Sequence, residues 1–265
     1  MNTVQVFAMV LMQLLGHKNK MPHKFEEIKK NLSHPKVVSE NYGNSVAAIR
    51  TPEFSLERQF LKKGRVFNIR FPGVVYVESG NLFVQEKDPY DRSKDLDLIQ
   101  GFAFNNPALT DTHFTVLEDT ITYFIRGNGQ IEAPAPGVIS PTFNDKDTYW
   151  GRIETFAAGD FTGKKMTMKK GTQSSLEYHL QKKEAYYLEE GELELGLRTD
   201  RAVNNSVVLR PGDVFVIPQG LMHMRIAHQD TVIIEASTRD SDTDTYFVED
   251  GKTYKHQPAE VYSLK

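Results

Sequence analysis

Two carboxylates and two imidazoles in the second half of the chain have the spacing of a metal site. Residues two apart in a strand point to the same face, so Glu177 and His179 can converge on one point. Glu184 follows a predicted turn, and an antiparallel return of the chain would bring its carboxylate beside that pair. His223 follows a Pro-Gln-Gly turn, at the start of another predicted strand. This nitrogen and oxygen set predicts one first-row divalent ion, with zinc, manganese, iron and nickel not distinguishable.

The elements that must position these residues are predicted to be short strands. Lys182 and Lys183 are expected to form a solvated turn between two of them. The second of these strands begins with the apolar run Ala185–Leu188 and ends at Gly191. Before His223, the segment 213–217 is predicted to be a short strand. The four polar side chains would therefore lie on strands and turns of one sheet structure.

Composition limits the class of protein. The chain has 265 residues and 39% hydrophobic residues, enough for one large or two small domains. A formal net charge of −3 gives no basic field, which argues against nucleic-acid binding. The absence of cysteine excludes disulfides, a thiol nucleophile and thiolate metal ligands, and it fits the cytoplasmic location that we expect.

The first 44 residues are predicted to be an N-terminal extension with a short helix at 24–33. The apolar run Val4–Leu15 is too short to span a bilayer, and it lacks the flanks of a signal peptide. No membrane partner is therefore expected. Met21 is an alternative start, and a helix packed on a partner chain is the alternative role for this run. From about Ser45 onward, strand patterns dominate.

The two segments around the polar residues resemble the two motifs of the cupin family. The first motif is Gly, five residues, His-x-His, three or four residues, Glu, six residues, Gly. Residues 171–191 have this spacing, with Glu177 in place of the first histidine. The second motif is Gly, five residues, Pro-x-Gly, two residues, His, three residues, Asn, and residues 212–227 match it with Ala227 for asparagine. The resemblance implies a small double-stranded β-barrel with the ion inside, held by Glu177, His179, Glu184 and His223.

An internal repeat predicts a second barrel in the first half of the chain. A shift of 111 residues places the segment YVESG, at 76–80, on YLEEG, at 187–191. The fold class is therefore predicted to be all-β: two tandem cupin double-stranded β-barrels of jelly-roll type, with a short N-terminal helical segment. The predicted boundaries are 1–44 for the extension, 45–131 for the first barrel, 132–146 for a linker, and 147–265 for the metal-binding barrel and tail.

The first barrel is predicted to lack the metal. Arg70 and Phe71 stand where ligands would be needed, and Thr112 falls on the position of His223. His113 is one place off, so in a strand it would face the wrong side. The expected role of this barrel is structural, either covering a sheet face of its twin or forming a subunit contact in a homodimer.

Residues of about 147–251 also resemble the mannose-6-phosphate isomerase group of cupins. Ser175–Gly191 is similar to the stretch Ser-Leu-Gln-x-His-x-x-Lys/Arg-x-Glu, with Glu177 at the glutamine position. Tyr149–Gly151 is similar to the Pro-Trp-Gly that opens that domain, and Ile234–Thr238, followed by an Asp-rich tail at 242–250, to the elements that close it. Where the tail of that family has Tyr-Gly-Arg, this chain has Tyr246 and Gly251-Lys252. Recognition of a substrate phosphate therefore does not follow from the resemblance. The resemblance implies a zinc-type site and a carbohydrate substrate.

Five further residues are candidates for the chemistry of an aldose–ketose isomerase. Tyr186 follows Glu184 by two and Arg225 follows His223 by two. Each is therefore expected to point into the barrel interior, on the same side as the predicted metal ligand before it. Glu235 lies in an otherwise apolar strand and is the candidate base. Tyr186 and Glu235 are the predicted catalytic residues, and the predicted substrate-binding residues are Lys169, Tyr178 and Arg225.

The sequence supports three readings of function. The first is a metal-dependent enzyme acting on a sugar or sugar phosphate, with aldose–ketose isomerisation as its reaction. The second is a non-catalytic barrel that binds a carbohydrate or other small ligand. The third is an iron-dependent dioxygenase or lyase. A catalytic ion keeps an open coordination position and a structural ion does not, which sequence patterns do not distinguish.

Overall fold

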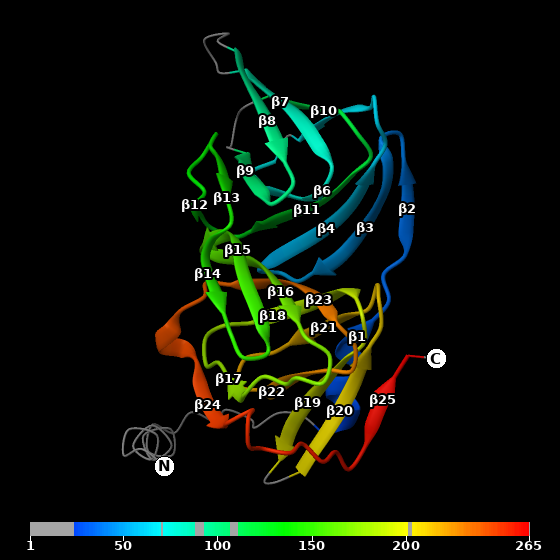
Figure 1. The fold of residues 1–265 in the computed structure, drawn as a ribbon, viewed down its shortest axis with the longest axis vertical. Helices are drawn as coiled ribbons and strands as arrows, with labels where there is room; N and C mark the ends of the chain where they lie inside the picture. The colour runs from blue at the N-terminus through cyan, green and yellow to red at the C-terminus, as the bar shows by residue number, and fades with distance from the viewer. Residues whose placement is uncertain (1–23, 70, 88–92, 107–110, 201–202, 265) are drawn as a thin grey trace.

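The computed structural model describes residues 24–69, 71–87, 93–106, 111–200 and 203–264. The predictions made for residues 1–23 and for Arg70 lie outside these ranges. Within them the chain folds almost entirely into strands, which form two barrels stacked along the long axis of the molecule (Figure 1). The predicted fold class is confirmed.

The first barrel is closed by a larger and a smaller antiparallel sheet of the described residues. The larger sheet has the order β13 (Ile139–Pro141), β9 (Phe102–Asn106), β6 (Gly73–Ser79), β11 (Thr120–Gly127), β4 (Phe54–Leu61), β3 (Gly43–Arg50) and β2 (Val37–Glu40). The smaller sheet has the order β5 (Val66–Ile69), β10 (Asp111–Val116), β7 (Asn81–Lys87) and β8 (Ser93–Ile99).

The second barrel repeats this plan. Its larger sheet has the order β1 (Leu32–Ser33), β21 (Val214–Ile217), β18 (Glu184–Glu190), β23 (Thr231–Thr238), β16 (Phe161–Met168), β15 (Gly151–Gly159) and β12 (Ile131–Ala133), with β14 (Phe143–Asp147) also paired to β15. Its smaller sheet has the order β24 (Tyr246–Glu249), β17 (Leu176–Tyr178), β22 (Met222–Ala227), β19 (Leu193–Asp200), β20 (Val203–Leu209) and β25 (Val261–Ser263). The 3-10 helix η2 (Asp242–Asp244) precedes β24.

The strand registers follow the predicted 111-residue repeat. In the first barrel Val75 of β6 pairs with Phe104 and Phe124. In the second barrel Tyr186 of β18, 111 residues further on, pairs with Phe215 and Glu235 in the same way. Structural equivalence can therefore be read directly from the numbering in this part of the two barrels.

That equivalence explains why the described residues of the first barrel form no ligand cluster like that of the second. Gly73 stands at the position of Glu184, and Phe124 at the position of Glu235. A Cβ on Gly73 would lie 2.6 Å from the ring of Phe124, so the aromatic ring fills the space that polar side chains occupy in the second barrel. Thr112 is buried at the position of His223. The interior of the first barrel is an apolar core.

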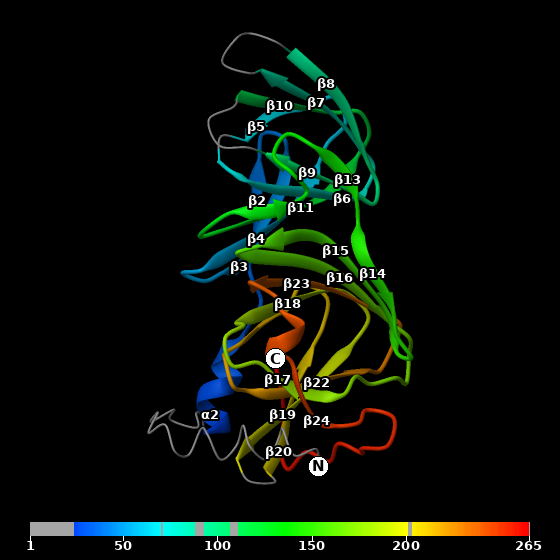
Figure 2. The ribbon, with the colours of Figure 1, turned by 90° about the vertical axis from the view of Figure 1, so that its left-hand side faces the viewer.

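The larger sheets of the two barrels pack face to face (Figure 2). Tyr76 and Phe156, one from each barrel, stack with their ring centroids 4.6 Å apart. One ion pair across this interface joins Lys183 to Glu53 at 2.9 Å. Two others each use a glutamate of the repeated YVESG and YLEEG segments. The pairs are Glu78 with Lys165 at 2.6 Å and Glu189 with Arg58 at 2.6 Å.

The N-terminal segment and the predicted linker are both integrated into the sheets. The predicted helix at 24–33 is one short turn, α2 (Phe25–Ile28), continued by the 3-10 helix η1 (Lys29–Asn31). It is shorter than expected because Leu32 already pairs with Phe215 of β21, in the second barrel. The predicted linker at 132–146 includes β13, which joins the first barrel, and most of β14, which joins the second.

Candidate metal centre

Three side chains inside the second barrel form a cluster with the dimensions of a metal site. One ligand atom each of Glu177, His179 and His223 lies within 4.8 Å of the other two, and all three residues are buried. Glu177 of β17 is paired directly with His223 of β22, so their side chains share the interior face of the smaller sheet. His179 follows Glu177 by two, as the sequence pattern required.

A hydrogen bond at Nδ1 of each histidine sets the tautomer of its imidazole ring. Nδ1 of His179 lies 3.0 Å from the carbonyl oxygen of Asp244, and Nδ1 of His223 lies 3.0 Å from that of Leu221. A carbonyl oxygen only accepts, so each Nδ1 must carry the proton. Both Nε2 atoms are therefore left with a free lone pair that can bind a cation.

Glu184, at the start of β18, faces these imidazoles. Its Oε1 lies 2.7 Å from Nε2 of His223 and 3.7 Å from Nε2 of His179. No hydrogen-bond partner for this buried oxygen exists among the described residues. Burial acts to raise the pKa of Glu184, but the nearby ammonium of Lys182 opposes it, and the pKa is held well below its ordinary value.

Together these groups fit a divalent cation. Two imidazole lone pairs and an ionised carboxylate oxygen converge in a buried space, an arrangement of acceptors that a positive ion stabilises. Glu177 contributes a second carboxylate from the opposite strand. The second barrel thus has a His/Glu site compatible with one divalent metal ion.

Arg225 lies beside the site, within the barrel. Its Nη2 donates a short hydrogen bond to Oε1 of Glu177, and its Nη1 donates to the hydroxyl of Tyr186 at 3.1 Å. Its guanidinium carbon lies 5.4 Å from the ring centroid of Trp150. Burial acts to lower the pKa of Arg225, but Tyr186 and the carboxylates, first among them Glu177, outweigh it and raise the pKa. Arg225 is therefore a buried, charged neighbour of the site.

Lys182 is not part of a solvated turn, and that prediction is wrong. Its side chain is 4% exposed, and its Nζ lies 2.8 Å from Oε2 of Glu184 and 2.8 Å from Oε1 of Glu235. Oδ1 of Asp240 lies 3.1 Å from the same ammonium. The reason is register: Lys182 precedes Glu184 by two and shares its inward face. The rule that residues two apart face the same side selected Tyr186 as an interior residue, and it would also have selected Lys182.

Glu235, the predicted base, belongs to this charged group. It is paired across the sheet with Tyr186 and with Lys164, whose Nζ lies 4.0 Å from its carboxylate. The carboxylate therefore faces the barrel interior, but it lies next to Lys182 rather than next to the imidazoles. The structure brings Tyr186, Arg225 and Glu235 into the same interior as the four polar residues.

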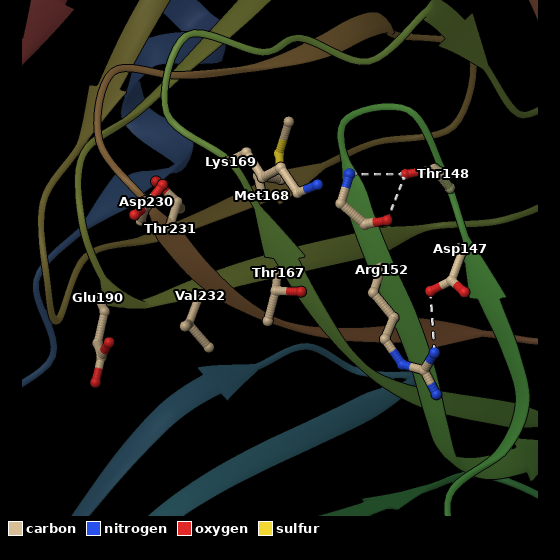
Figure 3. A pocket seen from close by; sticks show the side chains of 11 residues that line it. Asp147, Thr148, Arg152, Thr167, Met168, Lys169, Glu190, Asp230, Thr231 and Val232 are labelled. Atoms are coloured by element: carbon tan, nitrogen blue, oxygen red, sulfur yellow. Dashed lines mark hydrogen bonds and ion pairs between the residues drawn. The ribbon is translucent and has the colours of Figure 1, made fainter.

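The other two candidates lie elsewhere. Tyr178 points away from its neighbours Glu177 and His179 and stacks on Tyr246, with ring centroids 5.1 Å apart. Lys169 is exposed and lines a surface pocket of about 490 Å³ beside Arg152 and Asp230 (Figure 3). That pocket is lined by none of the four residues that converge inside the barrel. The substrate-binding roles of Lys169 and Tyr178 stay predictions.

Asp244 organises the loop between the ligands, a role that sequence reasoning missed. Its carboxylate accepts hydrogen bonds from the backbone N–H groups of Leu180 (3.0 Å), Gln181 (3.0 Å) and Lys182 (2.8 Å). Its backbone carbonyl oxygen accepts a hydrogen bond from Nδ1 of His179. One buried residue of η2 therefore orients the segment between His179 and Glu184. The only sequence signal was the Asp-rich tail in which it lies.

Replacement of Asp244 by asparagine is expected to weaken metal binding about 10–100-fold, because the amide cannot accept all of these N–H groups. Titration with a divalent ion, followed by calorimetry, measures the effect. Asp242→Asn, on the same short helix, is the matched control and should bind as the wild type does. Equal affinities for the two variants would contradict this role of Asp244.

A double-stranded β-barrel that encloses a His/Glu cluster defines the cupin class of proteins. A family model described as Cupin matches residues 160–261, which comprise most of the second barrel. Residues 160–261 are therefore similar to the Cupin family, and the described residues of the whole chain fold into two barrels of this kind. Comparison of the sequence with curated proteins finds no match.

Solved structures with a similar fold include bacterial oxalate decarboxylases. A point mutant of the Bacillus subtilis oxalate decarboxylase has a TM-score of 0.64 at 12% identity, with 87% of this chain and 86% of that chain covered. The Lactobacillus farciminis oxalate decarboxylase in complex with formate has a TM-score of 0.63 at 12% identity, with 82% and 88% covered. A further structure of the Bacillus enzyme, with a TM-score of 0.63 at 12% identity and 86% of each chain covered, concerns its Mn(II) centres.

These likenesses bear on the fold alone. The finer resemblance to mannose-6-phosphate isomerases stays a prediction. Within the described residues, no helix has the length and the apolar character that crossing a membrane requires.

Proposed function

We propose that this chain is a metal-dependent lyase that acts on a small substrate carrying a carboxylate. Its ion would be held by Glu177, His179, Glu184 and His223. The sequence favoured a lyase as one alternative, with iron as its ion, and here the ion can be any divalent metal. The similar structures that are oxalate decarboxylases, one of them described by its Mn(II) centres, support it over sugar isomerisation.

The observation that carries the proposal is the balance of charge inside the second barrel. Among the described residues, ion-pair contacts group four carboxylates and three basic side chains around the site, and His223 lies between Glu177 and Glu184 and joins the two parts of this group. The group has one net negative charge without an ion and one net positive charge with a divalent ion. A site of that sign in a low-dielectric interior favours an anion. The acidic members are Glu177, Glu184, Glu235 and Asp240, and the basic members are Lys164, Lys182 and Arg225.

Arg225 is the group best placed to bind a substrate carboxylate. A guanidinium presents its N–H donors in a planar fork that matches a carboxylate. In the structure this fork contacts Glu177 and Tyr186, directly beside the imidazole of His223. When Glu177 binds the ion, part of the fork becomes available to a second carboxylate. Arg225 would thus orient the substrate with its reacting end toward the ion.

The remaining groups would position the substrate and exclude water. The hydroxyl of Tyr186 lies 3.5 Å from Nε2 of His223, within reach of a substrate oxygen near the ion. Trp150 covers the guanidinium and limits solvent around it. A bound divalent ion supplies a Lewis acid that polarises substrate oxygens.

Sugar isomerisation, the first reading from the sequence, has weaker support. That reaction needs a free base, and the expected base Glu235 is already engaged with Lys182. Carbohydrate specificity, a homodimer and a cytoplasmic location all stay predictions.

The proposal is tested with protein loaded with Mn(II), Fe(II) or Zn(II) and a panel of small mono- and dicarboxylic acids. Release of carbon dioxide or of a shortened acid is the expected result. Arg225→Met should lower kcat/KM by about 100-fold or more, because a charge-assisted contact is lost. Arg239→Met, at an exposed surface ion pair, is the matched control.

His179→Ala should abolish the activity. The proposal is overturned if no acid is consumed with any of the ions, or if Arg225→Met reacts as fast as the control. Conversion of an aldose or ketose in a parallel panel would restore the isomerase reading in its place.

A further inference from the structure

The two oxygens of the Glu184 carboxylate face opposite surroundings. Oε1 is turned toward the imidazoles, 2.7 Å from Nε2 of His223. Oε2 is turned away from them and lies 2.8 Å from Nζ of Lys182. One oxygen is thus directed to the ion site and the other is occupied by an ammonium group.

The ammonium of Lys182 is itself held in place. Glu235 lies 2.8 Å from it and Asp240 3.1 Å. Lys164 fixes Asp240 in turn with a contact of 2.5 Å. The backbone N–H of Lys182 is bound to Asp244. Because the side chain is 4% exposed and contacted from three directions, Lys182 cannot turn to solvent without leaving buried carboxylates unpaired.

We propose that Lys182 is a positioning residue that keeps Glu184 a one-oxygen ligand and keeps the bound ion electron-poor. By occupying Oε2, its ammonium prevents the carboxylate from chelating the ion through both oxygens. It also competes for the negative charge of Glu184, so less of that charge reaches the ion. A coordination position is left for substrate, and the ion remains a strong Lewis acid.

This inference rests on Glu184 as a ligand in the proposed function, but it does not depend on the substrate. It leads to an unusual expectation. A residue that only stabilised the barrel would, when removed, loosen the site and weaken metal binding. Removal of Lys182 should strengthen metal binding, because one like charge leaves the neighbourhood of the ion and a second carboxylate oxygen becomes free.

The experiment uses Co(II) as a spectroscopic probe in the full-length protein. Four- and five-coordinate Co(II) absorbs visible light more strongly than six-coordinate Co(II). We expect Lys182→Met to bind Co(II) about tenfold more tightly than the wild type. Its visible absorption should be weaker, since the number of ligands rises. Lys182→Arg keeps the positive charge and should restore both the wild-type affinity and the wild-type spectrum.

Lys183→Met is the matched control, since Lys183 is adjacent but pairs with Glu53 of the first barrel, and it should change neither quantity. If Lys182→Met does not fold, the double variant Lys182→Met/Glu235→Gln removes one buried charge of each sign and is measured instead. Weaker Co(II) binding with an unchanged spectrum would overturn the inference. Both readouts are independent of turnover, so a failed acid panel would reject the lyase and leave the role of Lys182 standing.

Discussion

Replacement of His223 by alanine is expected to lower the metal content of the purified protein from near one equivalent per chain to near zero. His223 is fully buried, and its Nε2 faces both Glu177 and Glu184. Loss of a direct ligand should cost more than the 10–100-fold that loss of a supporting hydrogen bond costs. Metal analysis after dialysis at neutral pH, together with titration of the apoprotein, measures the change.

His228→Ala is the control for that experiment, because His228 is exposed and pairs with Glu194 outside the site. It should retain the wild-type equivalent of metal. His179→Ala should behave as His223→Ala does. Two equivalents per wild-type chain, or equal retention in the His223 and His228 variants, would contradict a single site in the second barrel.

Replacement of Glu189 by alanine is expected to lower the free energy of unfolding by about 3 kcal/mol. Two hydrogen bonds, of 2.8 and 2.6 Å, join its carboxylate to Arg58 of the other barrel, and the hydroxyl of Tyr123 donates to it at 2.5 Å. Truncation leaves a mostly buried guanidinium and a buried phenol without their acceptor. Urea unfolding followed by circular dichroism measures the loss.

Glu190→Ala, one residue further along β18, tests whether position or charge alone matters. Glu190 is exposed, so its removal should change the free energy of unfolding by less than about 0.5 kcal/mol. The double variant Arg58→Met/Glu189→Met removes both charges and should recover much of the loss. Equal stabilities of the Glu189 and Glu190 single variants would show that this ion pair does not hold the two barrels together.

Much of this architecture can be predicted from sequence because its signals are local. Alternation of period two tells which residues of a strand share a face, and it selected Tyr186 and Arg225 as interior residues. The spacing of glycines and prolines marks the turns of a barrel, and the 111-residue repeat carries that spacing into the first half. The same alternation also predicted that Glu177 and His179 would converge.

The pairing of charges between distant segments could not be predicted in this way. Lys182 was expected in solvent because two adjacent lysines usually form a solvated turn. Its partners are far from it in the sequence: Glu235 lies within β23 and Asp240 follows that strand. The role of Asp244 depends on η2 folding back over the ligand loop. No local pattern encodes these contacts.

By itself, the sequence determined the strands, the repeat, and which four side chains have the types and spacing to hold an ion. Only the tertiary structure decided the state of those ligands. Sheet pairing sets Lys182 against one oxygen of Glu184 and Arg225 against Glu177, and the backbone carbonyls of Asp244 and Leu221 set the imidazole tautomers. The physical reason is that the period of a strand fixes a face, whereas the charge that a buried group meets depends on which strands lie beside it.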